Sequence, residues 1–167
     1  WSILLGGRLD KHNLINHVIF SPRANLRFNP SEDINLRLSY SSGFRAPQAF
    51  DEDLHIENVG GTVSMIERAK NLKEEKSQSF SASADMYHRF GAFQVNFLVE
   101  GFYTRLSDVF VLENIGERDG ILIKERRNGS GAKVLGLSME GKMAYLSLFQ
   151  LQAGVTLQQS RYDEPEK

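Results

Sequence analysis

The chain has 167 residues, enough for one sizeable domain, and its formal net charge is -1. Its 20 Lys and Arg residues are scattered among 21 acidic residues without a basic stripe, which argues against a nucleic-acid binder. The absence of cysteine excludes disulfides, Cys-rich zinc sites and thiol catalysis from this segment. The sequence contains no run of about eighteen apolar residues, so it predicts no transmembrane helix. Because the chain begins at Trp1 inside a strand-like pattern with no initiator Met, we expect it to be an excised piece of a longer protein.

Alternation of apolar and polar side chains predicts about seven strands. Successive side chains of a strand point to opposite faces, so Leu26 and Phe28 share one face while Asn25 and Arg27 share the other. The same alternation recurs along the chain and predicts an all-β, antiparallel, up-and-down meander. The predicted strands are Ser2–Asp10, Ser21–Phe28, Asp33–Ser41, Ser77–Arg89, Ala92 to about Leu112, Lys133–Lys142 and Leu146–Ser160.

Short and long connections alternate between these strands. We expect tight turns near residues 29–32, 90–91 and 143–144, and long connections over residues 11–20, 42–76 and about 113–131. All long connections then emerge from one edge of the sheet, as in transmembrane β-barrels, whose strands need about nine to eleven tilted residues to cross a bilayer. The alternative is a soluble β-sandwich that binds a carbohydrate or another ligand and buries the apolar face against a second sheet.

Aromatic residues lie near both ends of the predicted strands. Phe28, Phe90 and Tyr145 fall near the short turns, whereas Tyr40 and Tyr103 fall toward the long connections. Two such levels are typical of the aromatic belts at membrane interfaces. The alternative is that aromatic residues simply favour strands.

The segments Leu38–Pro47, Asn71–Ser77, 102–110 and 136–140 carry a set of motifs that together resemble the barrel of TonB-dependent outer-membrane receptors. The stretch Leu38–Pro47 is similar to the family's strand ending in Ser-x-Gly-Phe-Arg-Ala-Pro, which leads into a long outer loop. The stretch Asn71–Ser77 resembles the Asn-x-x-Leu-x-Pro-Glu-x-Ser entry to the next strand, with a shortened lead and with Glu74 where Pro is usual. The ranges 102–110 and 136–140 resemble later strands, so the motifs follow family order over most of the chain.

The resemblance implies a fold, a location and a role. Residues 1–167 would be part of a 22-stranded transmembrane β-barrel, without its plug domain, in the outer membrane of a Gram-negative bacterium. Such receptors take up scarce nutrients (ferric siderophores, haem, cobalamin or glycans) and are not enzymes; no cofactor is expected. The implied partners are outer-membrane lipid, the receptor's own plug domain, the remaining barrel strands, and the TonB–ExbB–ExbD complex, which acts through the plug.

The Phe44-Arg45-Ala46-Pro47 motif is predicted to be structural. Pro47 ends the strand and biases Ala46 toward extended backbone, while Arg45 could pair with an acidic group in the lumen or on the plug. A direct ligand role for the motif is the alternative.

The long connection that follows supplies the candidate ligand contacts, because long outer loops build the mouth of such receptors. It is also rich in acidic residues over 51–57, but their spacing matches no calcium loop, and a solvated acidic loop is preferred. The ligand-contact candidates are Gln48, Phe50, Asp51 and His55.

Three further patterns are weaker. His12 and His17, with Asp10 nearby, have no obvious third ligand, so a metal or haem site is disfavoured. Asn128-Gly129-Ser130 fits a glycosylation sequon but suits a loop turn better. The residues 136–141 do not form a nucleophile elbow, and an outer-membrane enzyme lacks a matching Ser/His constellation. The charged residues expected to face the lumen are Arg23, Arg27, Arg37, Asp85, Glu100 and Glu140.

Overall fold

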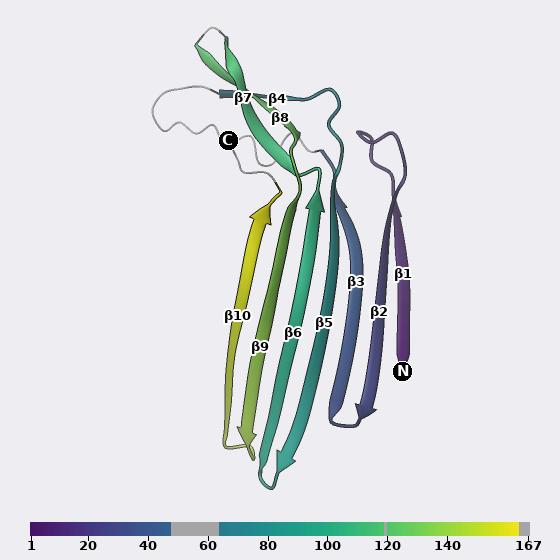
Figure 1. Cartoon of the computed structure of the whole chain (residues 1–167), viewed down its shortest axis with the longest axis vertical. Coiled ribbons are helices and arrows are strands. Elements are labelled where there is room, and N and C mark those ends of the chain that lie inside the picture. The colour runs from purple at the N-terminus through teal and green to yellow at the C-terminus, as the bar shows by residue number, and fades with distance from the viewer. Residues whose placement is uncertain (48–63, 119, 164–167) are drawn as a thin grey trace.

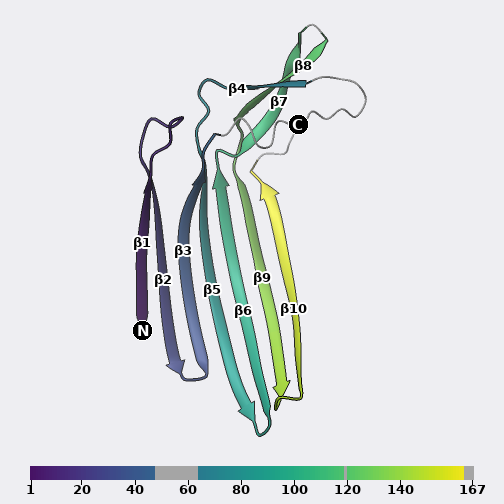
Figure 2. The ribbon, with the colours of Figure 1, turned by 180° about the vertical axis from the view of Figure 1, so that it is seen from behind.

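The computed structural model describes residues 1–47, 64–118 and 120–163. In these ranges the chain forms a tall, curved, single-layered sheet, here called the wall, and a small outer sheet beyond one end of it (Figures 1 and 2). The wall is antiparallel throughout, and its strand order is β1-β2-β3-β5-β6-β9-β10. Its strands are β1 (Ser2–Asp10), β2 (Ile19–Ser31), β3 (Ile34–Arg45), β5 (Glu75–Phe90), β6 (Phe93–Ser107), β9 (Ala132–Tyr145) and β10 (Phe149–Tyr162).

The outer sheet has three strands in the order β4-β8-β7. They are β4 (Ser64–Arg68), β7 (Phe110–Arg118) and β8 (Ile121–Asn128). The central strand β8 pairs antiparallel with β7 and parallel with β4. This sheet therefore joins two connections that are far apart in the sequence.

The register of the wall sorts its side chains into an apolar and a polar face. Residues paired directly across antiparallel strands lie on the same face. One apolar row crosses all seven strands, and a polar row lies on the opposite face. The apolar row is Ile3, Leu26, Leu38, Ala82, Gly101, Leu137 and Leu157, and the polar row includes Arg27, Arg37, Ser83, Glu100, Ser138 and Thr156.

The apolar face of the wall is not covered by another layer of the described chain. Leu38, Phe80 and Leu157 are 54%, 50% and 62% exposed, and the outer sheet lies beyond the strand ends instead of over this face (Figures 1 and 2). A sandwich would bury these side chains against a second sheet. In the described part of the chain, no helix is long and apolar enough to cross a membrane. The buried hydrophobic residues in the described ranges are Ile15, Ile19, Ala46, Ile123 and Ala132.

Aromatic side chains mark two levels of the apolar face, as predicted. Near the short turns, the ring centroids of Phe93 and Tyr145 lie 4.7 Å apart; toward the long connections, those of Tyr40 and Phe80 lie 4.8 Å apart. On β5 the two levels are ten residues apart, from Phe80 to Phe90. At a rise of about 3.3 Å per residue this is about 33 Å along the strand, or about 25 Å of height at a tilt of about 40°. That height matches the apolar band of a transmembrane barrel.

Two predicted boundaries are wrong for a backbone reason. The single predicted strand from Ala92 to about Leu112 is divided, because Asp108 has φ +56° and turns the chain from β6 into β7. The turn expected at residues 143–144 lies instead at residues 146–148, where Leu146 has φ +46°. Positive φ is uncommon outside Gly, and an apolar residue gives no sign of it, so the alternation alone predicts a strand at Leu146. The three strands of the outer sheet were not predicted as separate elements.

Candidate functional site

The described parts of the long connections gather at one end of the wall, here called the outer end (Figures 1 and 2). The first outer connection comprises residues 11–18. The second runs from residue 46 to residue 74 and includes β4, and the third runs from residue 108 to residue 131 and includes β7 and β8. Tight turns close the opposite end at residues 32–33, 91–92 and 146–148. The outer end is therefore the candidate functional site.

The predicted ligand-contact residues belong to the second outer connection. Gln48, Phe50, Asp51 and His55 lie outside the described residues, as does the acidic range 51–57. Their role stays a prediction from the sequence.

The Phe44-Arg45-Ala46-Pro47 motif contacts two of the outer connections. Ala46 is 8% exposed and packs with Ile15 and Ile19, against which the Phe44 ring also lies. The Arg45 guanidinium carbon lies 5.1 Å from the ring centroid of Phe110, the first residue of β7. A cation over an aromatic face at this distance contributes about 0.5–2 kcal/mol. The strand end that carries the motif is thus packed against the first connection and the third.

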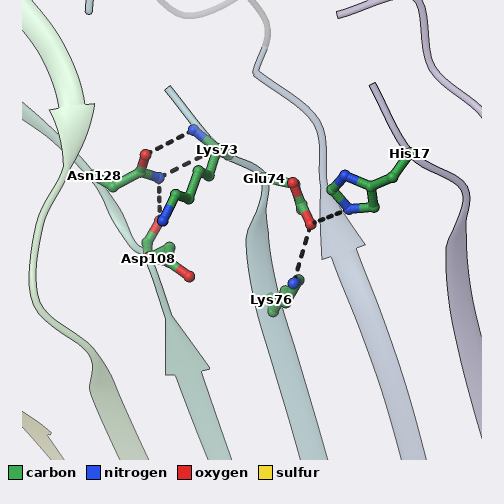
Figure 3. Close-up of polar contacts among 6 residues, drawn as sticks. All are labelled: His17, Lys73, Glu74, Lys76, Asp108 and Asn128. Atoms are coloured by element: carbon green, nitrogen blue, oxygen red, sulfur yellow. Dashed lines mark hydrogen bonds and ion pairs between the residues drawn. The ribbon is translucent and has the colours of Figure 1, made fainter. Parts of the chain in front are cut away.

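Glu74 lies at the centre of a polar contact between the first connection and β5. Its side chain is 4% exposed, and its Oε1 atom lies 3.0 Å from His17 Nε2 and 3.1 Å from Lys76 Nζ (Figure 3). Burial raises the pKa of Glu74, but hydrogen bonds from its backbone, Lys76 and His17 and the charge of Lys76 outweigh burial, so the net pKa is lowered. The carboxylate is therefore held in its charged form.

Asn128 joins the second connection to the third through its side-chain amide. Its Oδ1 accepts a hydrogen bond from the Lys73 backbone N–H at 2.8 Å (Figure 3). Its Nδ2 donates to the backbone carbonyls of Lys73 at 3.0 Å and of Asp108 at 2.8 Å. Both hydrogens of the amide are engaged, so the nitrogen of the apparent glycosylation sequon serves as a structural donor.

The outer sheet connects the same two segments along their length. β4 of the second connection pairs with β8 of the third, and the Ala69 N–H donates to the Arg126 carbonyl at 3.0 Å. The ion pair between Arg118 and Glu67, at 4.0 Å, adds to this link, whereas Arg127 pairs with Glu113 within the third connection. The second and third connections therefore share backbone and side-chain contacts.

The structure does not bring Asp10, His12 and His17 together as one site. Asp10 pairs with Arg8 at 2.6 Å, the Nδ1 atom of His12 accepts from the Leu14 N–H at 3.2 Å, and His17 contacts Glu74. Within the described ranges, no group of three or more His, Cys, Asp or Glu side chains is arranged to hold a metal ion.

The polar face of the wall carries hydrogen-bonded pairs of its own. Asp85 accepts from Asn96 Nδ2 at 2.5 Å and from the Tyr87 hydroxyl at 2.9 Å. On β9, Lys142 lies 2.8 Å from Glu140. These pairs allow charged groups to line one face of the wall without remaining unsatisfied.

Comparisons with known proteins agree on the fold. The family model described as "TonB dependent receptor-like, beta-barrel" matches residues 1–166. The siderophore receptor PirA from Pseudomonas aeruginosa aligns with a TM-score of 0.75 and 18% identity, over 96% of this chain and 31% of that one. The ferric enterobactin receptor PfeA, in complex with BCV-L6, aligns with a TM-score of 0.67 and 18% identity, over 94% and 24% of the two chains.

The FrpB iron transporter from Neisseria meningitidis (F3-3 variant) aligns with a TM-score of 0.63 and 19% identity, over 87% of this chain and 20% of that one. No curated protein matches the sequence. The chain spans between 20% and 31% of the length of these three solved structures.

Proposed function

Because the chain belongs to the TonB-dependent receptor β-barrel family, we propose that it forms part of an outer-membrane receptor that takes up a scarce nutrient. Members of this family are transporters, not enzymes. Ferric siderophores are the first candidate for this nutrient, since the similar structures are named as siderophore and iron transport proteins. Haem, cobalamin and glycans are the competing classes.

The uncovered apolar face is the observation that carries this proposal. One of its rows is apolar on all seven strands and lies between two aromatic levels, with a polar row on the opposite face. Hydrocarbon chains would cover the apolar face, and the polar face would line the interior and pack against the plug domain. β1 and β10 are edge strands in this chain, and they would pair with the remaining strands of the barrel.

The outer end would form part of the mouth that captures the nutrient. Gln48, Phe50, Asp51 and His55 are our proposed contact residues, because they belong to the second outer connection. Phe44, Arg45, Ala46 and Pro47 are proposed to hold the strand end in place instead of touching the ligand, which their packing against Ile15, Ile19 and Phe110 supports. TonB–ExbB–ExbD would supply energy through the plug.

A growth experiment tests the proposal. A strain lacking the receptor is grown with one nutrient source at a time (ferric siderophores, haem, cobalamin or glycans), with and without the full-length gene. The proposal expects growth to be restored on one class only, and to require TonB. Restoration without TonB, or recovery of the full-length protein outside the outer membrane, would overturn it.

A further inference from the structure

Asn128 lies where two outer connections leave the wall. It is the last residue of β8, Asp108 directly follows the end of β6, and Lys73 lies two residues before the start of β5. Two hydrogen bonds between its amide and the Lys73 backbone therefore join the bases of the second and third connections, and a third bond, to the Asp108 carbonyl, joins the two ends of the third connection (Figure 3). We refer to these three bonds as the Asn128 bridge.

We propose that the Asn128 bridge makes the second and third outer connections one conformational unit, whose described parts open and shift together. The unit consists of residues 64–74, 108–118 and 120–131. It is joined at its base by the bridge and along its length by the outer sheet, so neither connection can separate without breaking contacts at both places.

Contacts beside the bridge reinforce the base of the unit. The Phe110 N–H, at the start of β7, donates to Glu75 Oε2 at 3.1 Å, across the boundary between the third connection and β5. The Gly129 N–H donates to the Val109 carbonyl at 2.7 Å and closes the third connection on itself. Asp108 adopts φ +56° there, which directs the chain out of the wall at the point where its carbonyl receives the Asn128 donor.

The far part of the unit is joined by backbone pairing. All five residues of β4 are in parallel register with β8, from Ser64 opposite Leu122 to Arg68 opposite Arg126. Parallel pairing brings together segments that are distant in sequence. In the described sheets β4 is an edge strand, and the strand it pairs with is β8. The first outer connection contacts Glu74, at the base of the unit, through His17, but it contributes no strand to the outer sheet in the described ranges, so we do not count it in the unit.

If the proposed function holds, Asn128 is a positioning residue for capture: a nutrient bound by one of the two connections would reposition the other. The coupling itself can be measured without any nutrient. The growth experiment and the measurement of coupling can therefore fail independently of each other.

Hydrogen exchange of the full-length receptor in detergent micelles tests the unit. In Asn128→Asp the side chain keeps an acceptor for the Lys73 N–H. It loses the two hydrogen bonds that the amide nitrogen donates, because a carboxylate oxygen then faces the Lys73 and Asp108 carbonyls. We expect exchange to rise by at least about tenfold in peptides from both 64–73 and 110–128, as loss of buried hydrogen bonds predicts. Peptides from β5 and β6 should be unchanged.

Asn71→Ala, at an exposed Asn close to Lys73, is the matched control and should leave exchange in both segments at the wild-type rate. A rise in only one of the two segments in Asn128→Asp, or in neither, would overturn the proposal.

A second measurement does not depend on how Asn128→Asp folds. In the full-length receptor, with any cysteine outside these 167 residues replaced, spin labels can be placed at Arg68→Cys and Glu117→Cys, both exposed on the outer sheet, and at Ser160→Cys on β10. If β4 and β7 move as one unit, the distribution of distances between labels 68 and 117 should be no broader than the distributions between either of these labels and label 160. A broader distribution between 68 and 117 would show that β4 and β7 move independently, and would reject the unit.

Discussion

His17 and Glu74 are 57 positions apart in the sequence, yet His17 Nε2 lies 3.0 Å from Glu74 Oε1. The contact joins the first outer connection to the residue just before β5, and Lys76 neutralises the same carboxylate from the other side (Figure 3). Glu74 stands where the resembling family motif usually has Pro. The position that departs from the motif therefore helps to hold the first connection against the wall, beside the apolar packing of Ile15 on Ala46.

Removing the charge of Glu74 should loosen the first connection. Glu74→Gln loses a charge-assisted contact, which we expect to cost about 1 kcal/mol of local stability at neutral pH. Because the folded-state pKa of Glu74 is lowered, its contribution is present above the ordinary glutamate range, about 4, and is lost as pH falls through the lowered value.

Exchange of residues 11–20, corrected for the intrinsic effect of pH, measures this contribution. Protection should fall toward acid in the wild type and remain level in Glu74→Gln. Parallel curves for the two proteins would show that another group is responsible.

An arginine on the apolar face should be far more damaging than one on the polar face. Ala84 and Ser83 are neighbours on β5, midway between the two aromatic levels, and they point to opposite faces. For the full-length receptor in lipid vesicles, Ala84→Arg should cost about 2–4 kcal/mol of unfolding free energy. Ser83→Arg should cost much less, because position 83 is on the polar face, with Glu100 directly across from it on β6 and Arg37 directly across on β3. Urea titrations of both variants give the comparison, and equal losses would argue against lipid on that face.

Arg45 and Phe110 should be energetically coupled. A double-mutant cycle with Arg45→Ala and Phe110→Leu isolates their interaction from the other contacts of each residue. The expected coupling is about 0.5–1 kcal/mol in favour of the wild-type pair. A coupling of zero would mean that the Phe-Arg-Ala-Pro motif does not stabilise the third connection through this contact.

Two glycines on neighbouring strands should respond differently to alanine. A Cβ at Gly136 would lie 2.8 Å from the Leu157 carbonyl oxygen and 2.9 Å from Phe102 Cε1, whereas one at Gly101 would meet no atom within 4 Å. Gly136→Ala should therefore destabilise the barrel by about 1–3 kcal/mol, the usual cost of overpacking. Gly101→Ala serves as the control, and its midpoint in a urea titration should stay near that of the wild type.

The sequence was sufficient for the wall and insufficient for the outer end. Alternation with a period of two residues is a local pattern, so it located seven strands and both faces. The outer sheet depends on β4 pairing with a strand more than fifty residues away, which no local pattern reports. Positive φ at Asp108 and Leu146 also gave no compositional signal.

The candidate site was also only partly predictable from the sequence. The sequence pattern identifies the motif at Phe44–Pro47, but the roles of His17 and Asn128 depend on tertiary contacts. Neighbouring residues alone disfavour a metal site at His17 and favour a loop turn over a sequon at Asn128, and they indicate no distant partner for either residue. Their actual partners, Glu74 for His17 and Lys73 and Asp108 for Asn128, are brought close by the fold.

A spin-label scan along β5 would show whether the apolar face of the wall meets lipid. Single labels at positions 79–84 of the full-length receptor, in outer-membrane lipid, report access to oxygen and to a water-soluble nickel reagent. We predict a period of two, with high oxygen access and low nickel access at Phe80, Ala82 and Ala84 but not at the residues between them. Absence of this alternation, or shielding of those three positions from both reagents, would show that lipid does not cover the apolar face.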